Sequence, residues 1–304
     1  MGSVVARRHF LGRIAAASGT LAIMKPSAAT VAASDRFLTS AKLEDFDFYY
    51  EVHGEGPAVV FAHGSGGTHM SWWQQVPVLS QHYTCITIDH RTFGYSRDMP
   101  GGPGRRAFVQ DLKGLLDKLG VQKAALVGQS MGGNTVLGFA SAYPDRVNAL
   151  IMSDTTGGYS NPEIANLRRK FPPVTASVAT AFAPDFATRE PARLFLYREI
   201  SALTLGGGLA ATGVPPVPSA QSAAPAAASG TDLQPVLDKK IPVLFIVGEQ
   251  DMLIPPPIVE AMHRQMPGSE LARVAGAGHS VYFERPEDYN RLLLEFLGKH
   301  VRAA

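Results

Sequence analysis

The chain has 304 residues, of which 45% are hydrophobic and 18% are charged, and its formal net charge is +2. This length and apolar content suffice to bury one large core, and the near-neutral charge excludes a strongly basic protein that binds nucleic acid through its overall field. The single Cys85 excludes an internal disulfide, so packing alone must stabilise the fold.

The first 33 residues differ in composition from the rest of the chain. Arg-Arg-His-Phe-Leu at residues 7–11 precedes an apolar stretch at 14–24, and small residues surround Ala29 and Ala33. This pattern resembles a twin-arginine export signal and predicts a periplasmic or secreted protein. The apolar run is too short for the roughly 20 residues that span a bilayer, so no stable membrane anchor is expected. The alternative is a poorly ordered or amphipathic N-terminal extension.

Loss of this segment changes the charge of the protein. Residues 1–33 contain Arg7, Arg8, Arg13 and Lys25 and no acidic residue, so removing these four charges from +2 leaves −2. No basic stripe or polybasic patch then remains that would attract nucleic acid or anionic lipid. We therefore expect neither of these as a partner.

Strand-like and helix-like segments alternate after the leader. Phe46–Val52 predicts a strand at the sheet edge, and further strands are expected at Ala58–Ala62 and Thr84–Asp89. Helices are expected at Trp72–Ser80 and at Arg106–Leu119, where apolar residues recur at helical spacing. The alternation predicts βα units and a mostly parallel sheet with helices on its faces.

A glycine-rich loop, His-Gly-Ser-Gly-Gly at residues 63–67, follows the expected strand at 58–62. In hydrolases that use a serine on a strand–helix turn, one oxyanion donor is a backbone N–H from the loop after an early central strand. The N–H of Ser65 is the candidate for this donor.

The most informative motif is Gly-Gln-Ser-Met-Gly at residues 128–132, between the apolar run 124–127 and a helix-like stretch at 130–143. Small residues on both sides of the serine let strand and helix approach closely and expose the Ser130 hydroxyl in a strained conformation. The helix N-terminus offers free N–H groups, including that of Met131. These features predict a nucleophile elbow, although a serine between glycines can also be a helix cap.

A serine becomes nucleophilic only with a histidine base that a carboxylate orients. The strand-like run Ile241–Val247 leads into a turn that carries Asp251, and Leu271–Val274 leads into a glycine-flanked loop that carries His279. A helix is expected next, at Pro286–Leu297. The chain order Ser, Asp, His is the one associated with a nucleophile elbow.

Taken together, these motifs resemble the α/β-hydrolase superfamily from about residue 37 to the C-terminus. Asp-His-Arg-Thr-Phe-Gly-Tyr-Ser at residues 89–96 is also similar to the family's Asp-x-Arg-Gly-x-Gly-x-Ser loop, with Thr92 in place of a glycine. The resemblance implies an α/β fold with a mostly parallel central sheet and a helical cap, and a Ser-His-Asp triad that needs no cofactor. It also implies that the oxyanion is held by the N–H groups of Ser65 and Met131.

Three carboxylates compete for the role of the acid. Asp154 ends the expected strand Ala149–Ser153 and could also serve as a wall of the site or as a capping residue, while Glu249 is close to Asp251. The resemblance favours Asp251, since the family places the acid in that turn.

The strand–helix alternation stops between Thr155 and about Lys239, where helix-like pieces at Pro162–Phe171 and Arg189–Leu203 occupy the position of the family's cap. The uncharged Gly/Ala/Pro/Ser tract at 206–230 is typical of a flexible loop or lid margin, or of a tolerated surface insertion. The expected organisation is a signal peptide at 1–33, a first core part at 34–154, a cap at 155–239 and a second core part at 240–304.

The expected pocket combines aromatic side chains with a few polar groups, which favours an uncharged, apolar substrate of small to medium size such as a carboxylic ester or lactone. No Gly-rich phosphate loop or metal-ligand spacing is present, so neither a cofactor nor a metal is expected. Trp72 could equally be a core residue. The expected pocket residues are His63, Gly64, Trp72, Phe93, Tyr95, Asp154 and Tyr282.

Other activities of the family stay open as alternatives. Ser130 excludes haloalkane dehalogenases and epoxide hydrolases, which carry an aspartate at the elbow. Carbon–carbon bond hydrolases share the serine and a similar His-Gly-Ser-Gly loop, but they usually have a tryptophan where this chain has Ser280. Cofactor-free perhydrolase activity is a further possibility, and a ligand sensor on a hydrolase fold is the alternative that is not an enzyme. The sequence gives no indication of the oligomeric state.

Overall fold

A computed structural model describes residues 40–43, 47–99, 102–204 and 231–301. The expected export signal at 1–33 and the expected flexible tract at 206–230 lie outside these residues. In the part of the chain that the structure describes, no helix has the length and apolar character needed to cross a membrane.

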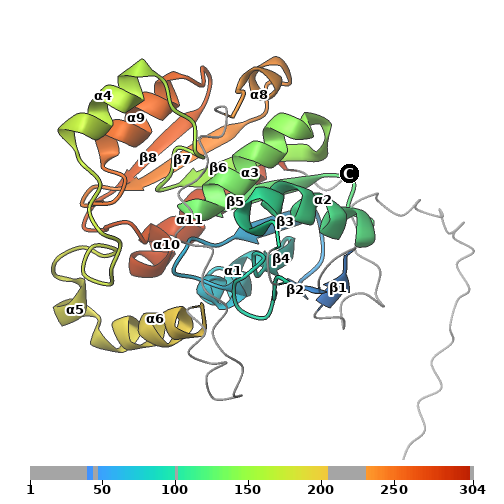
Figure 1. Ribbon diagram of the computed structural model, residues 1–304, viewed down its shortest axis with the longest axis horizontal. Coiled ribbons are helices and arrows are strands. Elements are labelled where there is room, and N and C mark those ends of the chain that lie inside the picture. The colour runs from blue at the N-terminus through green and yellow to red at the C-terminus, as the bar shows by residue number, and fades with distance from the viewer. Residues whose placement is uncertain (1–39, 44–46, 100–101, 205–230, 302–304) are drawn as a thin grey trace, which may run out of the picture.

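The centre of the molecule is an eight-stranded sheet with the order β1-β2-β4-β3-β5-β6-β7-β8 (Figure 1). β2 pairs antiparallel with β1 and with β4, and all other neighbouring strands are parallel. The strands are β1 (Ser40–Lys42), β2 (Asp47–His53), β3 (Ala58–Ala62), β4 (Thr84–Ile88), β5 (Ala124–Gln129), β6 (Val147–Ser153), β7 (Val243–Gly248) and β8 (Glu270–Val274).

The central strands are apolar along their whole length because helices cover both faces of the sheet. Every residue of β3, β4, β5 and β7 is buried, as expected for parallel strands between two helical layers. Successive residues point to opposite layers: in β3, Val60 belongs to one core cluster, and Val59 and Phe61 belong to the other. The sheet therefore separates two hydrophobic cores.

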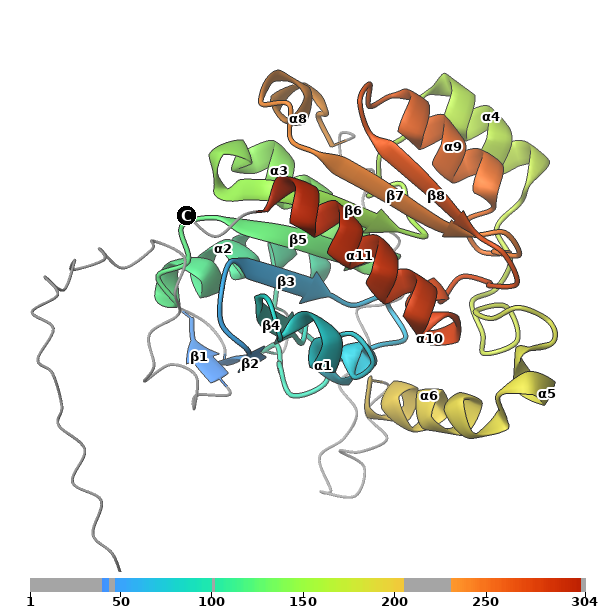
Figure 2. The same cartoon turned by 180° about the vertical axis from the view of Figure 1, so that it is seen from behind.

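One core lies under α2 (Phe108–Lys118), α3 (Met131–Ala142), α8 (Gln234–Asp238) and α9 (Pro256–Arg264). The other lies under η2 (His69–Trp72), α1 (Val76–Leu79), α10 (Val281–Glu284) and α11 (Pro286–His300), and Figure 2 shows α1 and α11 in front of the sheet. Two further 3₁₀ turns are η3 (Gly104–Ala107) and η4 (Pro144–Arg146).

The described chain between β6 and residue 204 supplies three helices of different length. α4 (Pro162–Lys170) packs against α9, whereas α5 (Phe186–Arg189) and α6 (Pro191–Thr204) lie beyond the carboxyl ends of the strands (Figure 2). Five side chains from α5, α6 and the segment just before α5 join the core under α10 and α11: Phe182, Phe186, Leu194, Tyr197 and Ile200. We refer to residues 171–204 as the cap segment.

The structure confirms the expected α/β architecture and corrects details of it. β2 is not the edge strand, because β1 pairs along its outer side; β1 is only three residues long and carries no alternating pattern that would reveal it. The expected helix at residues 72–80 is divided into η2 and α1, with Pro77 in the first turn of α1. Between residues 155 and 239, the described part contains no strand.

Candidate active site

Ser130 stands at the turn between β5 and α3. Its backbone has φ 50° and ψ −114°, a conformation that costs a non-glycine residue free energy and that is typical of functional turns. The flanking glycines allow the turn to pack: a Cβ atom on Gly132 would collide with the carbonyl oxygen of Ala62, and one on Gly128 would lie 2.5 Å from Val136. Close packing of β5, α3 and the end of β3 thus holds the hydroxyl of Ser130, which is partly exposed, above the sheet.

The structure brings Ser130, His279 and Asp251 together. The Nε2 atom of His279 is 2.8 Å from Ser130 Oγ, and its Nδ1 atom is 2.8 Å from Asp251 Oδ2. Since the carboxylate can only accept, Nδ1 carries the proton and Nε2 is left to accept the serine proton. This arrangement can remove a proton from the hydroxyl as it attacks an electrophile.

The carboxylate of Asp251 is held firmly on the turn after β7. Its Oδ1 atom accepts hydrogen bonds from the N–H groups of Leu253 and Ile254 at 2.8 and 2.9 Å, which leaves Oδ2 for the imidazole. The N–H of Gln250 donates to the carbonyl oxygen of Ala277 at 2.9 Å. The turn with the aspartate is therefore tied directly to the loop with the histidine.

The two alternative acids have other partners. Glu249 is exposed and faces the guanidinium of Arg273 at 3.5 Å. Asp154 is fully buried and accepts hydrogen bonds from the N–H of Gly248 at 3.0 Å and the hydroxyl of Ser153 at 2.9 Å. Burial raises the pKa of Asp154 well above its usual range, and the nearby Asp251 raises it further. Asp154 thus supports the start of the turn that carries Asp251.

The expected oxyanion donors lie beside Ser130. Met131 is the first residue of α3, so its N–H has no acceptor within the helix. A Cβ atom on Gly64 would lie 3.3 Å from Ser130 Cβ, which brings the Gly64–Ser65 peptide next to the serine. The carbonyl oxygen of Gly64 accepts a hydrogen bond from Gly67 at 3.1 Å, and this turn contains Ser65.

His63 is not part of an open pocket but is completely buried beneath this turn. Its Nδ1 atom is 2.7 Å from the carbonyl oxygen of Gly64, and its Nε2 atom accepts the N–H of His90 at 3.0 Å. The proton therefore resides on Nδ1, and the imidazole points the Gly64 carbonyl away from the side on which the Ser65 N–H projects. Burial lowers the pKa of His63 to about 4, so the neutral form persists at neutral pH.

Asp89 fixes the loop after β4. Its Oδ1 atom accepts the N–H of His69 at 2.6 Å, and its Oδ2 atom accepts the N–H of Tyr95 at 2.8 Å. Thr92, which replaces a glycine of the family's loop, has φ 73°, in the left-handed region that favours glycine. Thr92 therefore holds a backbone conformation that is less favourable for threonine than for glycine.

The expected pocket residues differ in exposure. Phe93 packs with Phe108 and Met131 in a small apolar cluster next to the serine. Trp72 is fully buried between Phe61 and Tyr282, which makes it a core residue. Tyr282 is buried as well, whereas Tyr95 is 55% exposed.

Three residues near the triad carried no recognisable signal in the sequence. Gln129 donates to the carbonyl oxygen of His279 at 2.8 Å. From the cap segment, Ser201 donates to the carbonyl oxygen of Gly66 at 2.8 Å, and the hydroxyl of Tyr197 lies close to Ser201 and Ser280. The cap segment therefore contacts both the loop with Ser65 and the loop with His279, a contact that only the folded chain reveals.

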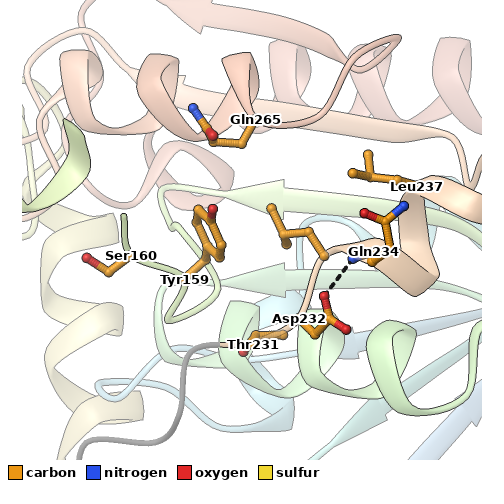
Figure 3. A pocket seen from close by; sticks show the side chains of 8 residues that line it. Tyr159, Ser160, Thr231, Asp232, Gln234, Leu237 and Gln265 are labelled. Carbon is orange, nitrogen blue, oxygen red and sulfur yellow. Dashed lines mark hydrogen bonds between the residues drawn. The ribbon is translucent and has the colours of Figure 1, made fainter. Parts of the chain in front are cut away.

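A cavity of about 480 Å³ lies elsewhere, between α8, the end of α9 and the loop after β6 (Figure 3). α9 begins near the carboxyl end of β7 and runs back along the sheet. Gln265, which follows α9, therefore lies towards the amino ends of the strands. The cavity is thus separate from the triad. Its other lining residues are Tyr159, Ser160, Thr231, Asp232, Leu233, Gln234 and Leu237.

Among the described side chains, no group of three or more His, Cys, Asp or Glu residues is placed to hold a metal ion. Beyond the carboxyl ends of β5, β7 and β8, the structure groups a serine hydroxyl, a carboxylate and an imidazole that are joined by hydrogen bonds.

Comparison with known proteins agrees with this geometry. Residues 57–286 match the model of the α/β hydrolase fold. A putative carbamate hydrolase RutD of Caulobacter segnis is 30% identical over 262 residues, which are 82% of this chain and 95% of that protein. A 2-hydroxy-6-oxo-6-phenylhexa-2,4-dienoate hydrolase of Comamonas testosteroni is 29% identical, over 86% of this chain and 94% of that protein. The solved structure of a thermophilic esterase from Thermogutta terrifontis superposes with a TM-score of 0.69 at 28% identity, over 86% of this chain and 97% of that one.

Proposed function

Because the chain belongs to the α/β-hydrolase fold family, we propose that it is a serine hydrolase that cleaves a carboxylic ester or lactone through an acyl-enzyme. The observation that carries this proposal is the continuous chain of hydrogen bonds from Ser130 through His279 to Asp251, with 2.8 Å at each step. The likeness to a solved esterase supports an ester as the substrate.

In the proposed reaction, Ser130 Oγ attacks the carbonyl carbon while His279 Nε2 accepts the hydroxyl proton. The N–H groups of Ser65 and Met131 donate to the oxyanion, and Asp251 stabilises the imidazolium. The tetrahedral intermediate collapses when His279 returns the proton to the leaving oxygen, so the alcohol departs and an acyl-serine remains. Water, deprotonated by His279, then attacks the acyl-serine. The second tetrahedral intermediate collapses when His279 gives this proton to Ser130 Oγ, which releases the acid and restores the free enzyme.

The apolar cluster of Phe93, Phe108 and Met131 supports an uncharged acyl group of small to medium size. We assign the cap segment, which contacts the loops of Ser65 and His279, to the admission of this substrate. Rates with p-nitrophenyl esters of graded chain length and with lactones test the proposal. Multiple turnovers of at least one of them are expected, whereas binding without turnover would indicate a ligand sensor.

A second candidate is hydrolysis of a carbon–carbon bond in a vinylogous diketone. The Comamonas relative carries the name of such a dienoate hydrolase, and the relative from Caulobacter is named for a carbamate. The same substrate panel should therefore include a vinylogous diketone and a carbamate, with perhydrolysis measured in the presence of peroxide. An ester rate far above the others is the expected result.

We further propose that residues 1–33 direct export of the folded protein, because Arg-Arg-His-Phe-Leu at residues 7–11 precedes an apolar, acid-free stretch. A fusion of this segment to a reporter should reach the periplasm or the medium. A reporter that stays in the cytoplasm would refute this localisation.

A further inference from the structure

Glu284, the last residue of α10, is a buried acid that joins two parts of the molecule. Its side chain is only 2% exposed. Oε1 accepts the N–H of Gly278 at 2.7 Å, and Oε2 accepts the N–H of Ala183 at 2.9 Å. Gly278 directly precedes His279, and Ala183 lies in the cap segment just before α5. A single carboxylate therefore links the loop with the histidine to the cap.

The two backbones that Glu284 links are in direct contact. A Cβ atom on Gly278 would lie 2.5 Å from the carbonyl carbon of Phe182 and 2.6 Å from the nitrogen of Ala183. The ring of Phe182 stacks on Phe186 at 4.5 Å and meets Tyr197 edge-on at 4.6 Å. The position of the histidine loop thus depends on the position of the cap segment, and the position of the cap segment depends equally on that of the loop.

Charged groups surround Glu284 on several elements. Arg189 of α5 and Arg285 after α10 both donate to the carbonyl oxygen of Gly276, at 3.5 and 3.2 Å, and Arg193 of α6 donates to the Glu284 carbonyl oxygen at 3.4 Å. The buried Asp154 approaches from the end of β6.

These surroundings shift the pKa of Glu284. Burial raises the pKa of Glu284 to about 7, while the two N–H groups and the charges of Arg189 and Arg285 oppose the rise. Two backbone donors are fully satisfied by a carboxylate, but a carboxylic acid offers one of them only a hydroxyl oxygen. Since the folded pKa is above the ordinary value, protonation begins near neutral pH and weakens one of the two links.

On the basis of the proposed function, we propose that Glu284 is a positioning residue that seats the cap segment on the His279 loop and that loosens this contact when it is protonated. Glu284 does not touch the reacting atoms. It acts by fixing Gly278, and hence His279, relative to Ser130 and to the part of the cap that carries Tyr197 and Ser201.

The test compares Glu284→Gln with Glu287→Gln, an exposed acid of α11, as the matched control. The amide that replaces the Glu284 carboxylate would place a donor against one of the two N–H groups. We therefore expect kcat on a p-nitrophenyl ester to fall about tenfold at about pH 8, and the ratio of the wild-type kcat to the variant kcat to shrink as the pH falls to about 6. Glu287→Gln should have the kcat and the pH profile of the wild type. Wild-type kcat and an unchanged pH profile in Glu284→Gln would overturn the proposal.

Amide hydrogen exchange gives a readout that does not depend on catalysis. After correction for intrinsic rates, peptides that contain Gly278 and Ala183 in the wild type should exchange faster as the pH falls from about 8 to about 6, and Glu284→Gln should show at least tenfold faster exchange at about pH 8. Protection that is constant with pH in the wild type would contradict the proposal, even if Glu284→Gln fails to fold. If Ser130 is not the nucleophile, these exchange rates still decide the role of Glu284.

Discussion

Gln129 Nε2 donates a hydrogen bond to the carbonyl oxygen of His279 at 2.8 Å, although 150 positions separate the two residues in the chain. Gln129 immediately precedes Ser130, and its Oε1 atom lies against Gly64, where an added Cβ would collide with it. One amide side chain thus contacts the histidine loop and the turn with Ser65 while its backbone belongs to the elbow. The three loops of the candidate site are held together by this residue.

Replacing Gln129 with leucine should therefore impair turnover without unfolding the protein. Leucine has a similar volume but leaves the carbonyl oxygen of His279 without its donor, so the imidazole loses part of its support. We expect kcat on an ester to fall about tenfold. Gln81→Leu, at an exposed position, serves as the control and should be neutral. Unchanged kinetics in Gln129→Leu would show that the contact does not position His279.

We propose Asp251, and not Asp154, as the acid of the triad. Asp251→Asn should lower kcat by about 10⁴, because the amide would no longer hold the imidazole in the required tautomer. Asp154→Asn should cost far less turnover, since Asp154 bonds to Gly248 and Ser153. Steady-state kinetics of both variants decide the matter, and a larger loss for Asp154→Asn would reverse the assignment.

Much of the fold follows from local sequence. The strands β3, β5 and β7 are continuous apolar runs that lead into the glycine-rich turn, Ser130 and Asp251, and the shorter strand-like run of β8 leads to His279, so their meeting at the carboxyl ends of the strands was predictable. Strand β1 was missed because three residues that pair only at the margin of a sheet carry no periodic signal.

The residues that support the candidate site were less predictable. Gln129, Ser201 and Glu284 act through backbone groups that are distant in the chain, and any neighbouring segment could supply such acceptors or donors. His63 and Trp72 were expected in the pocket because they lie close to the motifs in sequence. The structure buries both completely, since the glycine-rich turn and the helix after it pack against the sheet.

Protonation of His63 should destabilise the fold under mildly acidic conditions. Its pKa in the folded state is about 4, below the ordinary 6.5, so the unfolded chain takes up a proton first. The stabilisation is complete above about pH 6.5 and is lost as the pH falls towards 4, for a total of about 3 kcal/mol. Urea unfolding at about pH 7.5 and about pH 5 measures this change.

A matched pair of variants isolates the contribution of His63. His63→Asn keeps a donor for the carbonyl oxygen of Gly64 but does not titrate, so it should reduce the slope of stability against pH. His82→Asn, at an exposed position, should leave the slope unchanged. Equal slopes in the wild type and in His63→Asn would refute this role of His63.

The elbow should tolerate no side chain at Gly132. Gly132→Ala would drive a methyl group into the carbonyl oxygen of Ala62, which we expect to cost about 3 kcal/mol of unfolding free energy and most of the activity. Gly298→Ala, on the exposed side of α11 where nothing lies within 4 Å, should be neutral or stabilise by up to about 1 kcal/mol. Thermal unfolding of both variants measures the contrast, and a stable, active Gly132→Ala would disprove the close packing.

The central claim is that Ser130 is a nucleophile activated by His279 and Asp251. Its most direct measurement is to label the protein with a fluorophosphonate, locate the adduct by peptide mapping and compare the ester turnover of the wild type with that of Ser130→Ala. We predict one adduct, on Ser130, and a fall in kcat on the order of a million-fold in the variant, which should unfold at the same temperature as the wild type. An adduct on another residue, or a Ser130→Ala protein with the wild-type rate, would contradict the account.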